Sequence, residues 1–514
     1  MIDIMQTILE WLALLFVLAL GVGVLAVMVL YVVDRTQTTH AIRRNYPVIG
    51  RFRYVFETLG EYFRQYFFAM DREEMPFNRA QRSWVYRSAK GVSSVQAFGS
   101  TRDISKVGTV FFGNAAWPIL ESDLPESNGC LVMGEGVART PWQPGSFFNI
   151  SAMSYGSISK PAVRALSKGA AKAGIWLNTG EGGLSEWHLE GGCDVIFQMG
   201  TAKYGVRDHD GNLSDEKLQE VAAHDQVRAF EIKLSQGAKP GKGGILPAAK
   251  VTEEIARVRG IPQGKDSISP NRFPEVDNAA ALLDFVGHVR DVTGKPTGIK
   301  FVLGNPEFLD EICAEIVRRG ADTAPDFITL DSGDGGTGAA PMSLMDNVGL
   351  PLTESLPITH DALVRWGLKD RIRLVAAGKL LNPTDVAWAL CAGADFVNCA
   401  RGFMFALGCI QALQCDKNTC PTGITTHNAK LQRGLVVTDK AERVARFAKT
   451  MRKEVEVIAH SIGVAHPSQL TRQNCRVVQA DGRSCAMAEI WPQPEPGSAP
   501  QLSKLDAQIM DAQD

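Results

Sequence analysis

The chain has 514 residues, 45% of them hydrophobic, and a formal net charge of −2 at pH 7. This length and composition predict one large globular domain with appendages. The nearly balanced charge argues against nucleic-acid binding, because a nucleic-acid-binding protein needs a basic surface to neutralise phosphates. The ten cysteines do not predict a disulfide framework, which is typical of much shorter secreted chains.

The chain from Trp11 to Val33 is an apolar run of 23 residues without a charged side chain. At about 1.5 Å per helical residue, such a run crosses a hydrocarbon core of about 30 Å. The sequence therefore predicts a transmembrane anchor at residues 1–34, with a buried core helix as the alternative. A secretory signal peptide is disfavoured, because Asp3 and Glu10 stand where such a peptide is basic.

Arginines follow this run, and no Lys or Arg precedes it. Because positive charge stays on the cytoplasmic side of a membrane, we expect a single-pass protein of the inner (cytoplasmic) membrane with its catalytic domain in the cytoplasm. The nearest arginines are Arg35, Arg43, Arg44, Arg51 and Arg53.

Residues 35–144 are predicted to form a juxtamembrane extension that packs on the main domain. Within it, residues 54–68 are aromatic and amphipathic. This pattern is compatible with a helix lying along the membrane surface and equally with an ordinary helix packed on the main domain. The sequence leaves both possibilities open.

From residue 145 to 435, short apolar β-type runs alternate with turns holding Gly, Ser or Asn and with stretches of helical character. Eight strands alternating with helices predict an α/β fold, a (β/α)₈ TIM barrel, with a doubly wound open sheet as the alternative. The predicted strands are Phe147–Ala152, Ile175–Asn178, Val195–Gln198, Phe230–Leu234, Gly298–Leu303, Phe327–Asp331, Arg373–Ala377 and Phe396–Cys399. The predicted helices are 159–173, 214–223, 247–258, 277–292, 305–319, 359–368 and 382–392.

The remaining residues, 436–514, are predicted to add a helical extension at about 440–462 and a Pro-rich tail at 492–500. In a parallel barrel, chemistry lies on the loops after the carboxyl ends of the strands. The loops after the seventh and eighth strands contain Gly378, Lys379, Ala400 and Arg401. These residues predict a phosphate site, because glycine lets backbone amides approach an anion closely.

Three cysteines, Cys409, Cys415 and Cys420, lie within twelve residues directly after the last predicted strand. Thiols at this density bind metal or pair, and a cytoplasmic location disfavours pairing. The spacing and the Cys-Pro ending favour an iron–sulfur cluster. A zinc site with His427 as fourth ligand, and three buried cysteines without a ligand, are the alternatives.

Five runs of the sequence resemble, in the same order, the FMN-binding domain of the glutamate synthases. The last of them is similar to the three-cysteine loop that binds a 3Fe–4S cluster in that family. The resemblance covers about residues 145–435 and implies a barrel that binds FMN beside a 3Fe–4S cluster. It also implies reduction of 2-iminoglutarate, formed from 2-oxoglutarate and ammonia, to glutamate. The five runs are 152–159, 178–183, 232–241, 334–339 and 408–423.

The resemblance further implies roles for individual residues. Glu181 and Lys239 are implied to be catalytic, with Glu181 as a proton relay, and Arg259 and Gln236 to bind the substrate. Lys239 and Arg259 are suited to the two carboxylates of a dicarboxylic acid, although Arg259 could also be a solvated helix residue. The residues implied to bind FMN are Met153, Ser154, Gln198, Lys300, Asp331, Gly335, Gly336, Thr337, Gly378, Lys379, Ala400 and Arg401.

The sequence departs from the family beside the implied substrate. The family loop reads Lys-Pro-Gly-Glu-Gly-Gly-Gln, whereas residues 239–245 have Lys242 in place of the acid and Ile245 in place of the amide. One polar contact to the substrate is thereby lost. The same cofactors acting on a different amino or imino acid, and a membrane-docked electron-transfer subunit, therefore remain alternative functions.

The reductant is expected to come from outside the chain. No G-x-G-x-x-G fingerprint of a dinucleotide-binding fold is evident, which predicts an external electron donor such as ferredoxin or a membrane redox partner. Because the chain begins with the predicted membrane span in place of the family's glutaminase domain, we expect no glutamine hydrolysis in this polypeptide. A homo-oligomer is compatible with the sequence.

Overall fold

The computed structural model describes residues 2–93, 95–124 and 129–499. The chain divides into two compact units, Met1–Ala80 and Gln81–Asp514. The first contains α1 (Ile2–Thr36), α2 (Ala41–Asn45) and α3 (Gly50–Phe63), which continues into a π-helical turn, η1 (Arg64–Phe68). By length and composition α1 could cross a membrane, and none of its most apolar window is buried, which disfavours a core helix.

The second unit contains a closed barrel of eight parallel strands. This confirms the predicted (β/α)₈ barrel and excludes the doubly wound open sheet, which has free edges. Around the ring the order is β10-β11-β2-β3-β4-β5-β8-β9. The strands are β2 (Phe148–Ile150), β3 (Leu177–Asn178), β4 (Val195–Met199), β5 (Val227–Lys233), β8 (Thr297–Val302), β9 (Phe327–Asp331), β10 (Arg373–Ala377) and β11 (Phe396–Cys399).

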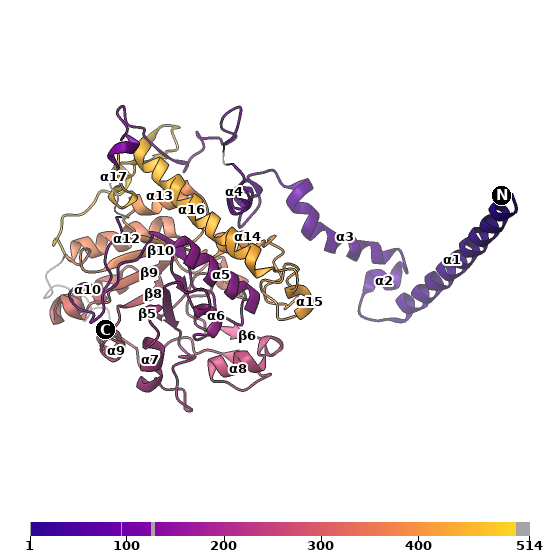
Figure 1. Cartoon of the computed structure of the whole chain (residues 1–514), viewed down its shortest axis with the longest axis horizontal. Coiled ribbons are helices and arrows are strands. Elements are labelled where there is room, and N and C mark those ends of the chain that lie inside the picture. Colours follow the sequence, from indigo (N-terminus) through magenta and orange to yellow (C-terminus); the bar gives the residue numbers. More distant parts are fainter. Residues whose placement is uncertain (1, 94, 125–128, 500–514) are drawn as a thin grey trace. The chain divides into compact units, whose positions relative to one another are not determined.

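Helices surround the barrel (Figure 1). Side chains cap the first turns of two of them, since Asn278 accepts from the Ala281 amide and Asn382 accepts from the Asp385 amide. With helices outside and side chains inside, β4 and β9 are buried along their whole length. The main helices are α5 (Lys160–Ala173), α7 (Asp215–Ala222), α8 (Glu253–Arg259), α9 (Ala279–Thr293), α10 (Glu307–Arg319), α12 (Leu352–Arg365), α13 (Pro383–Cys391) and α14 (Arg401–Leu407).

Two predicted helices have wrong boundaries. The helix predicted at 359–368 begins earlier, at Leu352. The predicted start followed Pro357, but this proline lies inside α12. Burial of one face of α12 offsets the free-energy cost of the backbone hydrogen bond that this proline removes. The helix predicted at 247–258 is interrupted: a 3₁₀ turn, η3 (Ala248–Lys250), ends before α8, and the Thr252 side chain caps α8.

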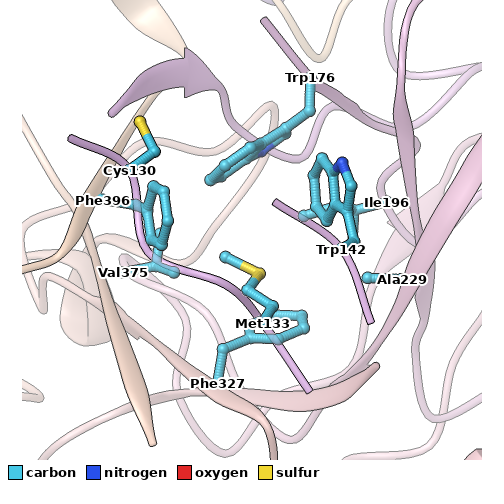
Figure 2. Packing of buried hydrophobic residues seen from close by; sticks show 9 residues of the cluster. All are labelled: Cys130, Met133, Trp142, Trp176, Ile196, Ala229, Phe327, Val375 and Phe396. Carbon is cyan, nitrogen blue, oxygen red and sulfur yellow. The ribbon is translucent and has the colours of Figure 1, made fainter. Parts of the chain in front are cut away.

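The amino-terminal end of the barrel is closed by an apolar cluster (Figure 2). Met133 and Trp142 pair through their backbones and come from the chain before the first strand. Trp142 contacts Trp176 edge to face at 5.5 Å between ring centroids, and Trp176 contacts Phe396 at 5.4 Å. Trp176 precedes β3, and Phe327 and Phe396 begin β9 and β11. The opposite end, where the strands finish, is therefore the end available for chemistry.

The C-terminal part covers one side of the barrel. Helix α16 (Val437–Ser461), predicted at about 440–462, packs against α5. A Cβ on Gly169 would lie 2.5 Å from the Val444 side chain, so glycine permits this close packing. Two small antiparallel sheets are β1 (Val110–Phe112) with β12 (Cys475–Val478) and β13 (Ser484–Ala486), and β6 (Ile245–Leu246) with β7 (Ser267–Ile268). The remaining elements are α4 (Arg79–Lys90), η2 (Glu121–Asp123), α6 (Glu186–Leu189), η4 (Ala321–Thr323), α11 (Met342–Met345), α15 (Ala429–Gln432), η5 (Pro467–Gln469) and α17 (Met487–Ile490).

Candidate active site

A pocket with an empty volume of about 590 Å³ lies at the carboxyl ends of the strands. The lining residues come from all eight barrel strands or from the loops that follow them. They are Ser151, Ala152, Ser154, Gly180, Gln198, Lys233, Gln236, Lys300, Asp331, Gly336, Ala377, Gly378, Lys379, Leu380, Leu381, Asn398, Cys399, Ala400 and Arg401.

Nine of the residues predicted to bind the cofactor line this pocket, as does Gln236, which was predicted to bind substrate. Met153, Gly335 and Thr337 belong to neighbouring loops but do not line it. The Gly335 amide donates to a main-chain carbonyl at 2.8 Å, which closes its own turn. Thr337 accepts a hydrogen bond from Gln236 at 3.4 Å and so contacts the pocket through that side chain.

Behind the inner wall of the pocket lies a buried carboxylate, Glu231, which is 1% exposed. It accepts from Asn178 Nδ2 at 2.8 Å, from Gln198 Nε2 at 2.7 Å and from the Thr329 hydroxyl. Because the Gln198 amide nitrogen is used in this way, its carbonyl oxygen remains for a ligand. The carboxylate thus fixes the orientation of a pocket side chain.

Lys300 adds a positive charge to the same wall. Its Nζ lies 3.2 Å from a carboxylate oxygen of Asp331. Burial alone would lower the pKa of Lys300, but the attraction of Asp331 and Glu231 raises it above its ordinary value. Lys300 therefore stays protonated at neutral pH.

The loops after β9, β10 and β11 form a basic corner of the pocket. A Cβ on Gly336 would lie 2.9 Å from Arg401 Nε, so only glycine lets the guanidinium approach this loop. Gly378 has a φ of +150°, and its Cβ would lie 2.3 Å from the Ser332 Cβ, which excludes larger residues. Lys379 forms an ion pair with Asp334 at 2.6 Å. Asp331 also lies near Arg401 but is paired with Lys300, so the three cations outnumber the two carboxylates and suit an anionic group.

Asn398 was not predicted from the sequence. It lines the pocket and is 2% exposed, and its Oδ1 has no hydrogen-bond partner in the part of the chain that the structure describes. A buried polar atom without a partner costs about 1–3 kcal/mol. A ligand that donates a hydrogen bond to this oxygen would remove that cost, so the pocket fits a bound polar group.

Beside the pocket, a second group of charges surrounds Glu181. Lys233 Nζ lies 2.8 Å from the Glu181 carboxylate. Burial would raise the pKa of Glu181, but Lys233 and Lys239 outweigh it and hold the pKa at about 2. Lys239 is 8% exposed, and burial lowers its pKa although Glu181 opposes the shift. Glu181 is therefore ionised and faces more than one cation.

Arg259 belongs to the same group. It is 4% exposed, so the alternative of a solvated helix residue is wrong: α8 turns this side chain inward. Its Nη2 donates to the Tyr155 carbonyl at 3.1 Å, and its guanidinium carbon lies 5.1 Å from the centre of the Tyr204 ring. Its Nε is buried and has no partner among the described residues. Arg259 thus keeps one donor for a ligand.

Lys233 was missed as a site residue. Its sequence signal is a lysine at the end of β5, a strand in which only Arg228 is exposed. A charged side chain in such a buried strand is expected to contact a group of opposite charge or a ligand.

Ile245 lies in the small β6–β7 sheet, and the residue before it approaches Glu181. A Cβ on Gly244, the preceding residue, would lie 2.8 Å from a Glu181 carboxylate oxygen. Ile245 pairs with Ile268 in register, and these side chains are 47% and 66% exposed. The residue that departs from the family loop is therefore an exposed apolar side chain next to the charged group.

The cysteine loop has an unusual backbone. Gln411, Leu413 and Asn418 have φ values of +56°, +54° and +59°, a conformation that few non-glycine residues adopt. Such strain persists where the surrounding structure enforces it, and it is common at functional sites. The Cys409 sulfur accepts from the Gln411 amide at 3.4 Å, the kind of contact that tunes a bound cluster.

The three thiols lie near enough for charge on one to affect the pKa of another. The pKa of Cys409 is raised to about 12, mainly by burial and in part by the nearby Cys415 and Cys420. Across residues 2–93, 95–124 and 129–499, no group of three or more His, Cys, Asp or Glu side chains is arranged to hold a metal. His427 Nε2 lies 2.7 Å from the Gly156 carbonyl. If Nε2 donates to this carbonyl, only Nδ1 of His427 remains as a possible metal ligand.

The chain matches known proteins over most of its length. Residues 134–465 match the model of the conserved region in glutamate synthase. The chain belongs to the glutamate synthase family. A glutamate synthase large subunit-like protein of Bacillus subtilis (strain 168), YerD, is 40% identical over 507 residues, which cover 90% of this chain and 96% of that protein. This family member is therefore a glutamate synthase-like enzyme, an oxidoreductase.

Two other relatives cover less of either chain. The archaeal-type glutamate synthase (NADPH) of Thermotoga neapolitana is 34% identical over 316 residues, 61% of this chain and 59% of that protein. A large subunit-like protein of Rhizobium meliloti (strain 1021) is 28% identical over 78% of this chain and 91% of its own length. A solved structure of a mandelate oxidase mutant with an FMN adduct is 16% identical, with a TM-score of 0.43 over 83% of this chain and 98% of that chain.

Proposed function

We propose that this glutamate synthase-like chain is an FMN- and iron–sulfur-dependent oxidoreductase that reduces 2-iminoglutarate, formed from 2-oxoglutarate and ammonia, to glutamate. The observation that carries the proposal is the pocket at the strand ends with Glu181 and its cations beside it. The pocket supplies room and hydrogen-bonding groups for a cofactor. The charged group supplies recognition of a dicarboxylic acid.

FMN fits the polar groups of the pocket. Arg401 and Lys379 face the basic corner, where a phosphate would be neutralised. The carbonyl oxygens of Gln198 and Asn398 can accept hydrogen bonds, and Lys300 keeps a positive charge beside them. Bound FMN supplies hydride transfer. The protein supplies orientation and the fixed positive charge, which stabilises a reduced, anionic ring.

The substrate is proposed to lie between Lys239 and Arg259, with each cation against one carboxylate. In the free protein these cations lower the pKa of Glu181. Substrate carboxylates that neutralise them would let the pKa of Glu181 rise. Glu181 could then take up a proton and deliver it to the imine nitrogen, so that a hydride and a proton convert the imine to an amine.

The iron–sulfur cluster is proposed to be held by Cys409, Cys415 and Cys420. Thiolates are the ligands that such clusters prefer, and the strained loop fixes their positions. The cluster supplies single-electron transfer from an external donor such as ferredoxin or a membrane redox partner. We propose that α1 anchors the enzyme in the inner membrane, with the barrel in the cytoplasm.

Steady-state turnover tests this function against its alternatives. The full-length protein with a chemical one-electron donor should form glutamate from 2-oxoglutarate and ammonia. A panel of other 2-oxo acids should be poorer substrates. Faster conversion of another 2-oxo acid would identify that acid as the substrate in place of 2-oxoglutarate. No conversion of any of these acids would favour an electron-transfer subunit.

Replacing Ile245 by Gln distinguishes the proposed substrate from a less polar one. If the protein forms glutamate, its site works without that amide, and we expect kcat/KM for 2-oxoglutarate to change less than about threefold. Lys217→Gln, outside this loop, is the control. Should the native substrate be less polar, its binding would cover the new amide and strip it of water, which would weaken substrate binding by roughly 1–3 kcal/mol. A large gain for 2-oxoglutarate would therefore contradict the proposed substrate.

Gly378→Ala should release FMN. The added Cβ would collide with Ser332 at a φ of +150°, so the loop after β10 must move away from the basic corner. We expect at least about tenfold weaker FMN retention on gel filtration. The matched control is Gly304→Ala in the loop after β8, where nothing lies within 4 Å of the new Cβ. Equal retention in both variants would remove this loop from the cofactor site.

A further inference from the structure

The helix that follows the membrane anchor has an exposed apolar face. Positions spaced three and four residues apart along α3 and η1 bring large apolar side chains to one side. Each of them is between 37% and 73% exposed. We call these residues the apolar stripe: Phe52, Val55, Phe56, Leu59, Phe63, Tyr66 and Phe67.

The start of α3 is tied to the end of α1 by a buried ion pair. Asp34 is 1% exposed and is the only buried side chain among the described residues of α1. Its carboxylate accepts from Arg51 Nη2 at 2.7 Å and Nε at 2.8 Å, and from the Val48 amide at 3.0 Å. Arg35 also donates to the Arg44 carbonyl at 3.1 Å. The chain between the two helices is thus folded back on the end of α1.

This junction sets the depth of α3 in a bilayer. Asp34 directly follows Val33, the last residue of the apolar run, so a spanning α1 places Asp34 at the level of the lipid headgroups. Arg51 is in hydrogen-bond contact with Asp34 and must lie at the same level. The apolar stripe begins one residue later, at Phe52.

Val48 supports a fixed junction. This β-branched residue has a φ of +65°, which is a true outlier for a branched side chain. The Val48 amide donates to Asp34 in that conformation. Such a backbone persists where the surrounding contacts enforce it, so the start of α3 does not move freely relative to α1.

We propose that α3 and η1 lie in the membrane interface, with the apolar stripe buried among lipid acyl chains. The charge of the segment fits anionic headgroups, because residues 35–72 contain seven arginines and three carboxylates. Aromatic side chains, which form most of the stripe, favour the interface between acyl chains and water. The inference rests on the proposed anchoring by α1 and is independent of the proposed reaction.

The interfacial helix gives the anchor a second role. A single spanning helix joined to a flexible linker would let the enzyme rotate freely. A second helix held in the membrane plane adds a rigid support at the point where the chain leaves the bilayer. The chemical class of the partner is a lipid surface that contains anionic headgroups.

Photocrosslinking in the full-length protein tests this surface. Benzoylphenylalanine replaces Phe56 in protein reconstituted in bilayers of phosphatidylethanolamine and phosphatidylglycerol, and mass spectrometry identifies the adducts after irradiation. Glu57, exposed on the neighbouring polar face, is the matched control. Phe16 in the centre of α1 reports whether the anchor itself is in the bilayer. None of these side chains is buried, so the substitutions are expected to leave the fold intact.

We expect lipid adducts at Phe16 and Phe56, with several-fold less lipid adduct at Glu57. Lipid at Phe16 but barrel peptides at Phe56 would overturn the inference in favour of a helix packed on the catalytic unit. Adducts between two copies of the chain at Phe56 would overturn it in favour of a dimer contact. Absence of lipid adducts at Phe16 would refute the anchoring on which the inference rests. None of these results would contradict the proposed reaction.

Discussion

Replacing Cys415 with Ser is expected to remove the iron–sulfur cluster and leave FMN bound. The hydroxyl is a poor iron ligand, and a three-cysteine site has no spare thiol in its loop. The pocket proposed for FMN is lined by other residues, so the flavin should remain. Iron and acid-labile sulfide analysis, with electron paramagnetic resonance of the oxidised protein, measures the cluster. Absorbance of the released flavin measures FMN.

Cys485→Ser is the control for this substitution. Cys485 is half-buried in β13, outside the cysteine loop, and the variant should keep its full iron content. A Cys415→Ser protein with unchanged iron, or zinc in place of iron in the unsubstituted protein, would contradict the assignment of the three thiols.

Lys239→Ala is expected to lower kcat/KM for 2-oxoglutarate by about 30- to 800-fold, equivalent to about 2–4 kcal/mol. Lys239 is buried beside Glu181, so its removal leaves a substrate carboxylate without its partner in a site of low dielectric constant. The flavin spectrum should not change, because Lys239 does not line the pocket. Initial rates over a range of substrate concentrations provide the measurement.

Lys242→Ala in the same loop is the matched control. Lys242 is exposed, and loss of an exposed charge is expected to change kcat/KM less than about threefold. A Lys239→Ala enzyme within threefold of the unsubstituted protein would exclude a substrate carboxylate at this lysine.

The barrel could be predicted because its strands are short apolar runs that end in polar loops, and this pattern is local. The start of α12 could not, since Pro357 is a helix breaker by its own chemistry and is accommodated only by packing that the sequence does not display. The break between η3 and α8 was missed for a similar reason. Its cap, Thr252, is one residue within a long helical pattern.

Part of the site could also be predicted from local sequence patterns. Glycine-rich loops at the strand ends identified Gly336, Gly378 and their neighbours in the pocket. Arg259 was ambiguous, because its neighbours along the chain are charged and only the turn of α8 buries it. Asn398 and Lys233 were missed, because a single polar residue in a buried strand shows its partners only when the barrel closes.

The central claim, reduction of the imine of 2-oxoglutarate at this flavin site, is tested most directly by a single turnover without oxygen. Purified full-length protein is reduced stoichiometrically and mixed with 2-oxoglutarate and ammonium, while flavin absorbance and glutamate are followed together. We expect the flavin to be reoxidised with formation of one glutamate per flavin, and no reoxidation when either reactant is omitted. Flavin that stays reduced in the presence of both reactants, in a protein that retains FMN and its cluster, would contradict the claim.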